Sequence, residues 1–173
     1  MDSNKWHQRP ITDSAQRILK QIPPRASERG LHVVDGASIV KLALWSVLLW
    51  ERKVGLVALE RSGANRFDLV RGLDLLLEEK ASEHPVAYDK QRGVLVLVKT
   101  DLPYDGWDFD ALLEPLLRQA EHEAKDLMHN YVGSEHLVLA IVELADPALR
   151  VLLQQHGVSH KQVKEAVVSL LHP

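Results

Sequence analysis

The chain carries the same helical pattern twice, and this internal repeat is the feature that most constrains its fold. Ala26 aligns with Ala124 at an offset of 98 residues, and this offset holds through the first long apolar segment. Beyond that segment the offset becomes 94 residues, which pairs Gly63 with Gly157. The change corresponds to about one helical turn, inserted in the first half. Self-similarity of this kind predicts two related structural units that pack on each other.

Apolar spacing of three and four residues predicts helices in both halves. They are expected at 14–22, 38–50, 56–61 and 65–80, and again at 111–128, 134–144, 148–155 and 159–171. The segment 38–50 is apolar on nearly all sides, so it is expected to be a buried central helix. Pro23 and Pro24 are expected to interrupt the first helix, because proline lacks the backbone N–H that a helix needs.

Between the halves, residues 84–100 carry aliphatic β-branched runs on both sides of a polar loop, a pattern that predicts a β-hairpin. The expected fold is therefore mainly α, with two pseudo-twofold-related four-helix repeats and a short β-hairpin insertion between them. One domain is expected over 1–173. Repeat one covers about 11–80, the linker with the hairpin about 81–109, and repeat two about 110–172.

Composition excludes several classes of function. The 173 residues include no cysteine, which removes disulfides and thiolate chemistry. A net charge of -3 argues against strong nonspecific nucleic-acid binding. The most apolar stretch, 39–50, spans about 18 Å as a helix, too short to cross a bilayer, and the first ten residues lack a signal core. We therefore expect a cytoplasmic protein with neither nucleic-acid nor membrane partners.

Motifs for catalysis and cofactors are missing from the sequence. It contains no P-loop, no H-E-x-x-H zinc motif and no G-x-S-x-G nucleophile elbow. An enzyme is therefore not expected, and neither is a bound cofactor.

A polar turn with the sequence HNYVGSEH, at 129–136, precedes the second helix of the second half. Gly133 permits a tight turn, and Ser134 is a favourable helix N-cap. Glu135 places a negative charge in the first helical turn, where the helix dipole favours it. Taken alone, these residues start a helix.

The surrounding segment, LRQAEHEAKDLMHNYVGSEHLVLAIVE at 117–143 followed by LLQQHGVSHKQVKEAVVSLL at 152–171, resembles the repeat of the Clp amino-terminal domain of Clp/Hsp100 chaperones. The first half resembles it through ITDSAQRIL at 11–19 and through its general pattern. The resemblance implies a stand-alone protein-binding domain that serves a Clp ATPase or protease as an accessory or adaptor. The implied partner is a Clp ATPase, a Clp peptidase or a substrate protein.

In some Clp unfoldases the glutamate of this motif receives the guanidinium of phosphoarginine. The resemblance therefore implies Ser134, Glu135 and His136 as partner- or substrate-binding residues. The equivalent positions of the first repeat hold Gly36 and Ala37, which offer no charge for a cation.

Two tryptophans on the most apolar predicted helix are candidates for a partner or dimer patch. Trp45 and Trp50 are five residues apart, about 140° around a helix axis. They cannot point in the same direction, so one is expected in the core. The other is expected at the surface, where aromatic side chains anchor interfaces.

A weak metal candidate comes from His122, Asp126 and His129, which share one face if the helix continues to residue 129. Two imidazoles and a carboxylate are a ligand set that zinc accepts, although a solvated helix face explains the same pattern. Two further alternatives stay open: a diverged dimeric interaction or scaffold module no longer linked to Clp, and a protein that binds a metal or small ligand.

Overall fold

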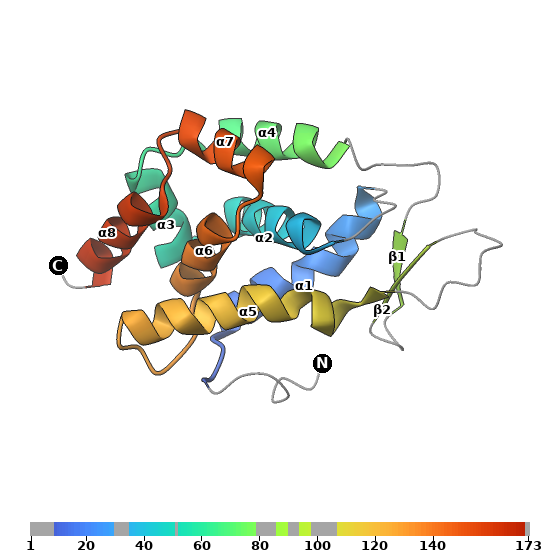
Figure 1. The fold of residues 1–173 in the computed structure, drawn as a ribbon, viewed down its shortest axis with the longest axis horizontal. Coiled ribbons are helices and arrows are strands. Elements are labelled where there is room, and N and C mark those ends of the chain that lie inside the picture. Colours follow the sequence, from blue (N-terminus) through green and yellow to red (C-terminus); the bar gives the residue numbers. More distant parts are fainter. Residues whose placement is uncertain are drawn as a thin grey trace.

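The computed structural model describes residues 9–29, 35–50, 52–78, 86–89, 94–97 and 107–171. Within these ranges, four helices precede the strands and four follow them (Figure 1). The first four are α1 (Asp13–Glu28), α2 (Gly36–Trp50), α3 (Val54–Arg61) and α4 (Arg66–Glu78). The last four are α5 (Phe109–Asp126), α6 (Ser134–Glu143), α7 (Pro147–Gln155) and α8 (His160–Leu171). The predicted mainly helical fold is confirmed.

Three short strands lie between the two sets of helices. β1 (Val86–Asp89) pairs antiparallel with β2 (Val94–Leu97), and β2 pairs antiparallel with β3 (Trp107–Asp108). The strands lie to one side of the helical body, near α1 (Figure 1). Residues 90–93, the loop of the predicted hairpin, lie outside the described part of the chain.

The core is built around α2 and α6, which lie at the centre of the molecule and contact each other (Figure 1). Most side chains of both helices are buried, polar ones included. Helix α1 covers α2, and α5 covers α6, each burying the apolar side of an amphipathic helix. The predicted buried central helix is therefore confirmed in α2, and α6 has the same role in the second half.

The two glycine turns at the ends of α3 and α7 show how the halves are related. Gly63 and Gly157 both have positive φ, 107° and 69°, which side chains rarely tolerate. A Cβ built on Gly63 would lie 3.5 Å from the carbonyl oxygen of His156, and one built on Gly157 would lie 3.8 Å from that of Ser62. The helices pair in the same reciprocal way, since α3 contacts α8 and α4 contacts α7. Such reciprocity is what a pseudo-twofold relation produces.

The prediction that the prolines interrupt the first helix is wrong. α1 runs continuously from Asp13 to Glu28 and contains both Pro23 and Pro24. Ile22 and Ala26, on either side of the prolines, are fully buried in the core. Burial on both sides stabilises the helical path and offsets the hydrogen bonds that the prolines cannot make.

An ion pair between a buried lysine and a partly exposed aspartate connects the two halves. The ammonium of Lys41, on α2, lies 2.5 Å from a carboxylate oxygen of Asp146. The other carboxylate oxygen of Asp146 accepts the backbone N–H of Leu149 at 2.9 Å and so caps α7. A single side chain therefore starts a helix of the second half and neutralises a charge buried in the first.

No helix within the described ranges is both long and apolar enough to cross a membrane.

Candidate functional site

The segment 128–136, which we call the glycine–histidine turn, connects α5 to α6. α5 ends at Asp126, and Met128 then adopts a left-handed conformation with φ of 57°. The far side of the turn pairs with the start of the chain. The Val132 N–H donates to the carbonyl of Pro10, and the Thr12 N–H donates to the carbonyl of Val132, both at 2.9 Å. The turn is therefore held by a segment that is distant in sequence.

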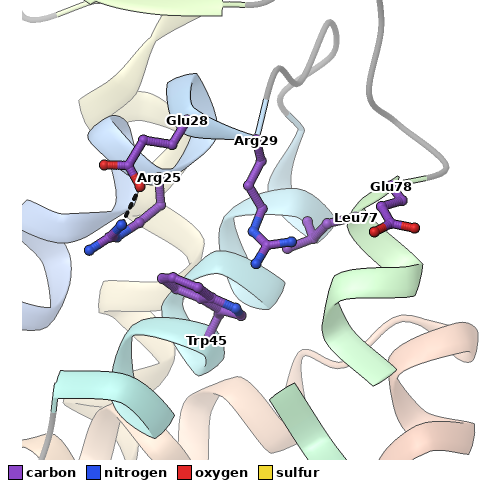
Figure 2. A pocket seen from close by; sticks show the side chains of 6 residues that line it. All are labelled: Arg25, Glu28, Arg29, Trp45, Leu77 and Glu78. Atoms are coloured by element: carbon purple, nitrogen blue, oxygen red, sulfur yellow. Dashed lines mark hydrogen bonds and ion pairs between the residues drawn. The ribbon is translucent and has the colours of Figure 1, made fainter. Parts of the chain in front are cut away.

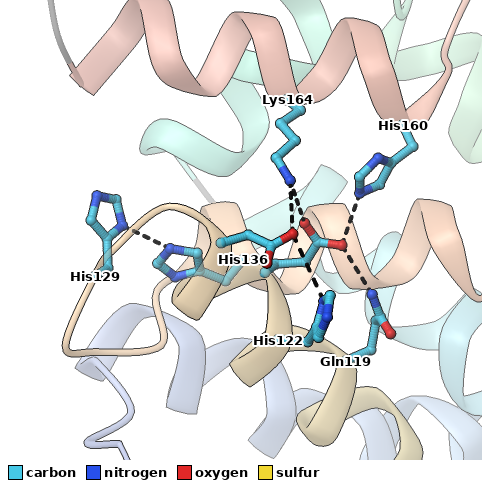
Figure 3. Close-up of polar contacts among 8 residues, drawn as sticks. Gln119, His122, His129, His136, His160 and Lys164 are labelled. Atoms are coloured by element: carbon cyan, nitrogen blue, oxygen red, sulfur yellow. Dashed lines mark hydrogen bonds and ion pairs between the residues drawn. The ribbon is translucent and has the colours of Figure 1, made fainter.

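His136 is the buried polar centre of this turn. Its Nδ1 accepts the backbone N–H of Gly133 at 2.8 Å, and its Nε2 lies 2.8 Å from Nδ1 of His129 (Figure 3). Burial, followed by the nearby charges of His129 and Arg9, lowers the pKa of His136 to about 4. The ring is therefore neutral at pH 7. Because Nδ1 accepts, the proton is assigned to Nε2, which donates to His129.

The carboxylate of Glu135 lies directly over Gly133. A Cβ at residue 133 would be 2.5 Å from both carboxylate oxygens, so any larger residue here would require the Glu135 side chain to move. Glu135 is only 5% exposed. Burial raises the pKa of Tyr131, and the charge of Glu135 and a hydrogen bond with it raise that pKa further. The carboxylate of Glu135 therefore interacts with Tyr131 and lies against Gly133.

The structure changes the roles expected for the turn residues. α6 begins at Ser134, so the N-cap is Gly133, not the predicted Ser134. The third residue of the helix, His136, satisfies the backbone N–H of that N-cap. Ser134, Glu135 and His136 are all buried, and their visible contacts order the turn. Whether a partner also touches them stays a prediction.

The weak metal candidate is not assembled. His122 and Asp126 lie 3.9 Å apart on α5, but His129 comes after the helix has ended and bonds to His136 instead (Figure 3). A hydrogen bond from Lys164 lowers the pKa of Asp126. The helix ends because the chain turns at Met128, so the seven-residue spacing no longer places three side chains on one face.

Among the described residues, one cluster of side chains could offer ligands to a metal ion: His129, Glu135 and His136 each have a ligand atom within 4.8 Å of the other two. Both ring nitrogens of His136 already have hydrogen-bond partners, one of them the N–H that begins α6. A metal ion would have to displace these bonds. The cluster is therefore satisfied as a structural element.

The tryptophans divide as expected. Trp45 is 7% exposed and Trp50 is 59% exposed, which confirms that one belongs to the core and the other to the surface. The indole N–H of Trp45 donates to Asp74 at 3.0 Å, and Asp74 also pairs with Arg29 at 2.5 Å. The partner role of either tryptophan stays a prediction.

Trp45 borders a cavity of about 470 Å³, which we call the Trp45 pocket (Figure 2). Its other described lining residues are Arg25, Glu28, Arg29, Leu77 and Glu78. The guanidinium of Arg25 lies 5.0 Å from the Trp45 ring centroid, and that of Arg29 lies 4.8 Å away. Sequence reasoning missed both arginines. On a continuous helix, residues four apart lie on the same face, so the spacing of the two arginines could have indicated that they lie side by side. We expected the prolines to interrupt that helix, and the spacing was therefore not used.

A second polar cluster connects α5 to α8, and sequence reasoning missed it too. The buried carboxylate of Glu123 accepts from Gln119 and contacts Nε2 of His160, both at 2.9 Å (Figure 3). Lys164 lies 3.6 Å from its second oxygen. These contacts connect the first turns of α8 to α5, which is a structural role.

The fold and the turn together define a class: a helical double-repeat domain whose second half carries a glycine–histidine turn. Residues 108–173 match the family model described as the Clp repeat (R) N-terminal domain. The resemblance visible in the sequence of the second half is thus confirmed.

Solved structures extend the likeness to the whole chain. The Hsp104 N-terminal domain from Candida albicans is 15% identical with a TM-score of 0.58, covering 94% of this chain and 92% of that one. The N-terminal domain of the chaperone ClpD from Arabidopsis thaliana is 12% identical with a TM-score of 0.58, covering 100% of both. A structure from preliminary investigations of a malarial protein secretion system is 16% identical with a TM-score of 0.63, covering 92% and 93%. The chain therefore has the fold of Clp N-terminal domains.

Proposed function

We propose that this chain is a noncatalytic protein-binding domain that works with a Clp/Hsp100 ATPase in the cytoplasm as an adaptor or accessory. The observation that carries the proposal is the fold: the likeness to the Hsp104 and ClpD N-terminal domains covers nearly all of the chain. The Clp repeat match at 108–173 supports it independently from the sequence. Domains of this kind bind substrates and adaptors for the ATPase that carries them.

The exposed surface supports binding rather than a buried chemical site. The resemblance points to Ser134, Glu135 and His136, but these side chains are buried and can shape a partner surface only indirectly. Trp50 is the predicted site residue that presents a large apolar area to solvent. An exposed tryptophan is a frequent anchor of protein interfaces. We therefore place the partner surface near the end of α2.

The test is affinity purification of the tagged chain from its host, with mass spectrometry, followed by binding measurements with the purified Clp ATPase and peptidase. We expect the Clp ATPase or the peptidase to be enriched and to bind directly. Binding by Trp50→Ala is then compared with binding by Phe67→Ala, a control that removes another exposed aromatic ring. Weaker binding by Trp50→Ala alone would locate the partner surface near Trp50. If neither Clp component is enriched and neither binds when purified, the proposal is wrong.

A diverged self-associating module is the second candidate. It is favoured by large apolar side chains at the surface, including Phe67 at 76% and Leu75 at 65% exposure, both on α4. Light scattering after size exclusion decides it, because the monomer has a mass of 19.5 kDa. A mass of twice that value, reduced by Leu75→Asp, would support self-association, and a monomer at all concentrations would reject it.

Phosphoarginine recognition at Glu135 is a finer form of the proposal. Titration of free phosphoarginine against the wild type, Glu135→Gln and the control Glu143→Gln tests it. Glu143 is an exposed glutamate at the other end of α6, so its substitution should leave any binding at Glu135 unchanged. No binding by the wild type rejects this form of the proposal and leaves the protein-binding role open.

A further inference from the structure

Helix α4 lies at the surface beside α7, and its outward side carries large apolar side chains (Figure 1). The two helices are close where Gly72 meets Leu152, because a Cβ on Gly72 would overlap that leucine side chain. Leu75 is 65% exposed on the outward side of α4, and Phe67 is 76% exposed. Single exposed apolar residues are common on protein surfaces, so their exposure alone does not identify a partner.

The repeat provides an internal comparison for this surface. Helix α8 is the counterpart of α4, and the offset of 94 residues places Lys161 at the position of Phe67 and Ser169 at that of Leu75. Both residues of α8 are exposed and polar, and Lys161 pairs with Glu165 of its own helix at 3.9 Å. The same place in the fold can therefore be polar throughout. Packing within the chain does not require exposed apolar side chains on α4.

Charges of opposite sign lie on the two sides of Leu75 along α4. Arg71 lies one turn before the leucine and Glu78 one turn after it, and all three side chains are exposed. Residues separated by four and by three positions share one face of a helix. Within the part of the chain that the structure describes, neither Arg71 nor Glu78 has an ion-pair partner. We call these three residues the α4 face.

The α4 face is complementary to itself when two copies of the helix pack antiparallel. A twofold axis beside Leu75 brings the leucines of both copies together and places Arg71 opposite the partner's Glu78, once on each side of the axis. The rise of the helix separates the two ion pairs by about 10 Å. Parallel packing in register would instead place like charges opposite each other. The charges therefore select the antiparallel arrangement.

We propose that the α4 face binds a second copy of this chain, with the two α4 helices antiparallel. Burial of Leu75 supplies the apolar contact, and the two reciprocal ion pairs set direction and register, since exposed pairs contribute more to specificity than to affinity. This inference rests on the self-association considered above as the second candidate, whose surface it specifies. It does not depend on whether a Clp component also binds.

An exchange of charges tests the register, with sedimentation equilibrium at low salt as the measurement. We expect the wild type to form a reversible dimer. Arg71→Glu or Glu78→Arg alone turns both attractive pairs into repulsive ones and should weaken the dimer at least about tenfold. The double variant with both substitutions should dimerise again. A mixture of the two single variants should form a heterodimer, because opposite charges then face each other at both positions.

Leu75→Asp tests the apolar contact and should weaken the dimer about a hundredfold, because both copies lose a buried leucine side chain. Two matched controls lie on α8. Lys161→Glu changes the net charge as much as Arg71→Glu does, and Val168→Asp replaces an apolar side chain that is 41% exposed. Both controls should dimerise as the wild type does. Circular dichroism of each variant verifies the fold.

Three results would overturn the inference, and each has a different meaning. A monomer of 19.5 kDa at all concentrations rejects self-association itself. A dimer that the single charge reversals leave unchanged keeps self-association but rejects the α4 face. Weakened dimers that recover neither in the double variant nor in the mixture reject the antiparallel register. Capture of a Clp partner by a monomeric protein leaves the Clp role standing and rejects only the dimer.

Discussion

Acid should destabilise this protein through His136, by an amount that its environment sets. In the folded chain the pKa of His136 is about 4, against 6.5 for an ordinary histidine, because burial disfavours the charged ring. Between these two values the unfolded chain binds a proton that the folded chain does not. The contribution of His136 to the free energy of unfolding is therefore fully present above pH 6.5 and is lost as the pH falls toward 4. The full difference corresponds to about 3 kcal/mol.

The assay is urea denaturation followed by circular dichroism at pH 7.5 and pH 5, for the wild type and His136→Asn. Asparagine keeps an acceptor for the Gly133 N–H but does not titrate. From the two pKa values, the wild type should lose about 2 kcal/mol more than the variant between these pH values. All other titrating groups are common to both proteins and cancel in the comparison.

Equal pH dependence of the two proteins would refute this reasoning. An NMR titration of the wild-type His136 ring provides a second measurement that does not depend on the variant folding. Its midpoint should fall near pH 4, and a midpoint near 6.5 would show that the ring is accessible to solvent and not held neutral by burial.

The other predictions concern contacts between the two halves, and urea denaturation at pH 7 measures each. Asp146→Ala removes a helix cap and leaves the buried Lys41 without its counter-charge, so it should lower the free energy of unfolding by about 3–5 kcal/mol. Adding Lys41→Met should recover part of the lost stability. An unchanged or larger loss in the double variant would contradict the ion-pair role of these two residues. Gly55→Ala would place a Cβ 2.8 Å from the backbone oxygen of Ser134 and should cost about 1–3 kcal/mol. Gly36→Ala meets nothing within 4 Å and should not destabilise, so equal effects of the two alanines would refute the packing argument.

Much of the fold could be read from local pattern. The apolar pattern that predicts α2 and α6 is strong, because most residues of both helices are buried and most of the buried ones are apolar. The offset between Gly63 and Gly157 also identified the repeat, since positive φ at both turns leaves glycine as the favoured residue. These features depend on neighbours along the chain, so the sequence contains the information directly.

The sequence identified the residues of the glycine–histidine turn but assigned the helix cap to the wrong one. Helix-start chemistry and the family resemblance both pointed to Ser134, Glu135 and His136. Local rules assigned the cap to Ser134, whereas His136 makes the decisive bond to the N-cap residue. A histidine acting in this way has no common local signature, because it depends on burial by the rest of the core.

The Trp45 pocket was not predicted, because its arginines share one face only if α1 is continuous. Arg25 reaches both tryptophans only because α1 continues through Pro23 and Pro24, and that continuity depends on packing against α2. Local propensity predicted the opposite. The correct answer required the burial of residues on both sides of the prolines, which is a tertiary property.

The sequence by itself therefore determined the helical repeat, the buried central helix of the first half and the likeness of the second half to a Clp repeat, because each is set by short-range spacing of apolar and turn residues. Only the tertiary structure decided which tryptophan is exposed, where the histidines point and which side chains line the Trp45 pocket. Those properties arise where segments distant in the chain meet, and burial there sets the charge state of His136 and the exposure of Trp50.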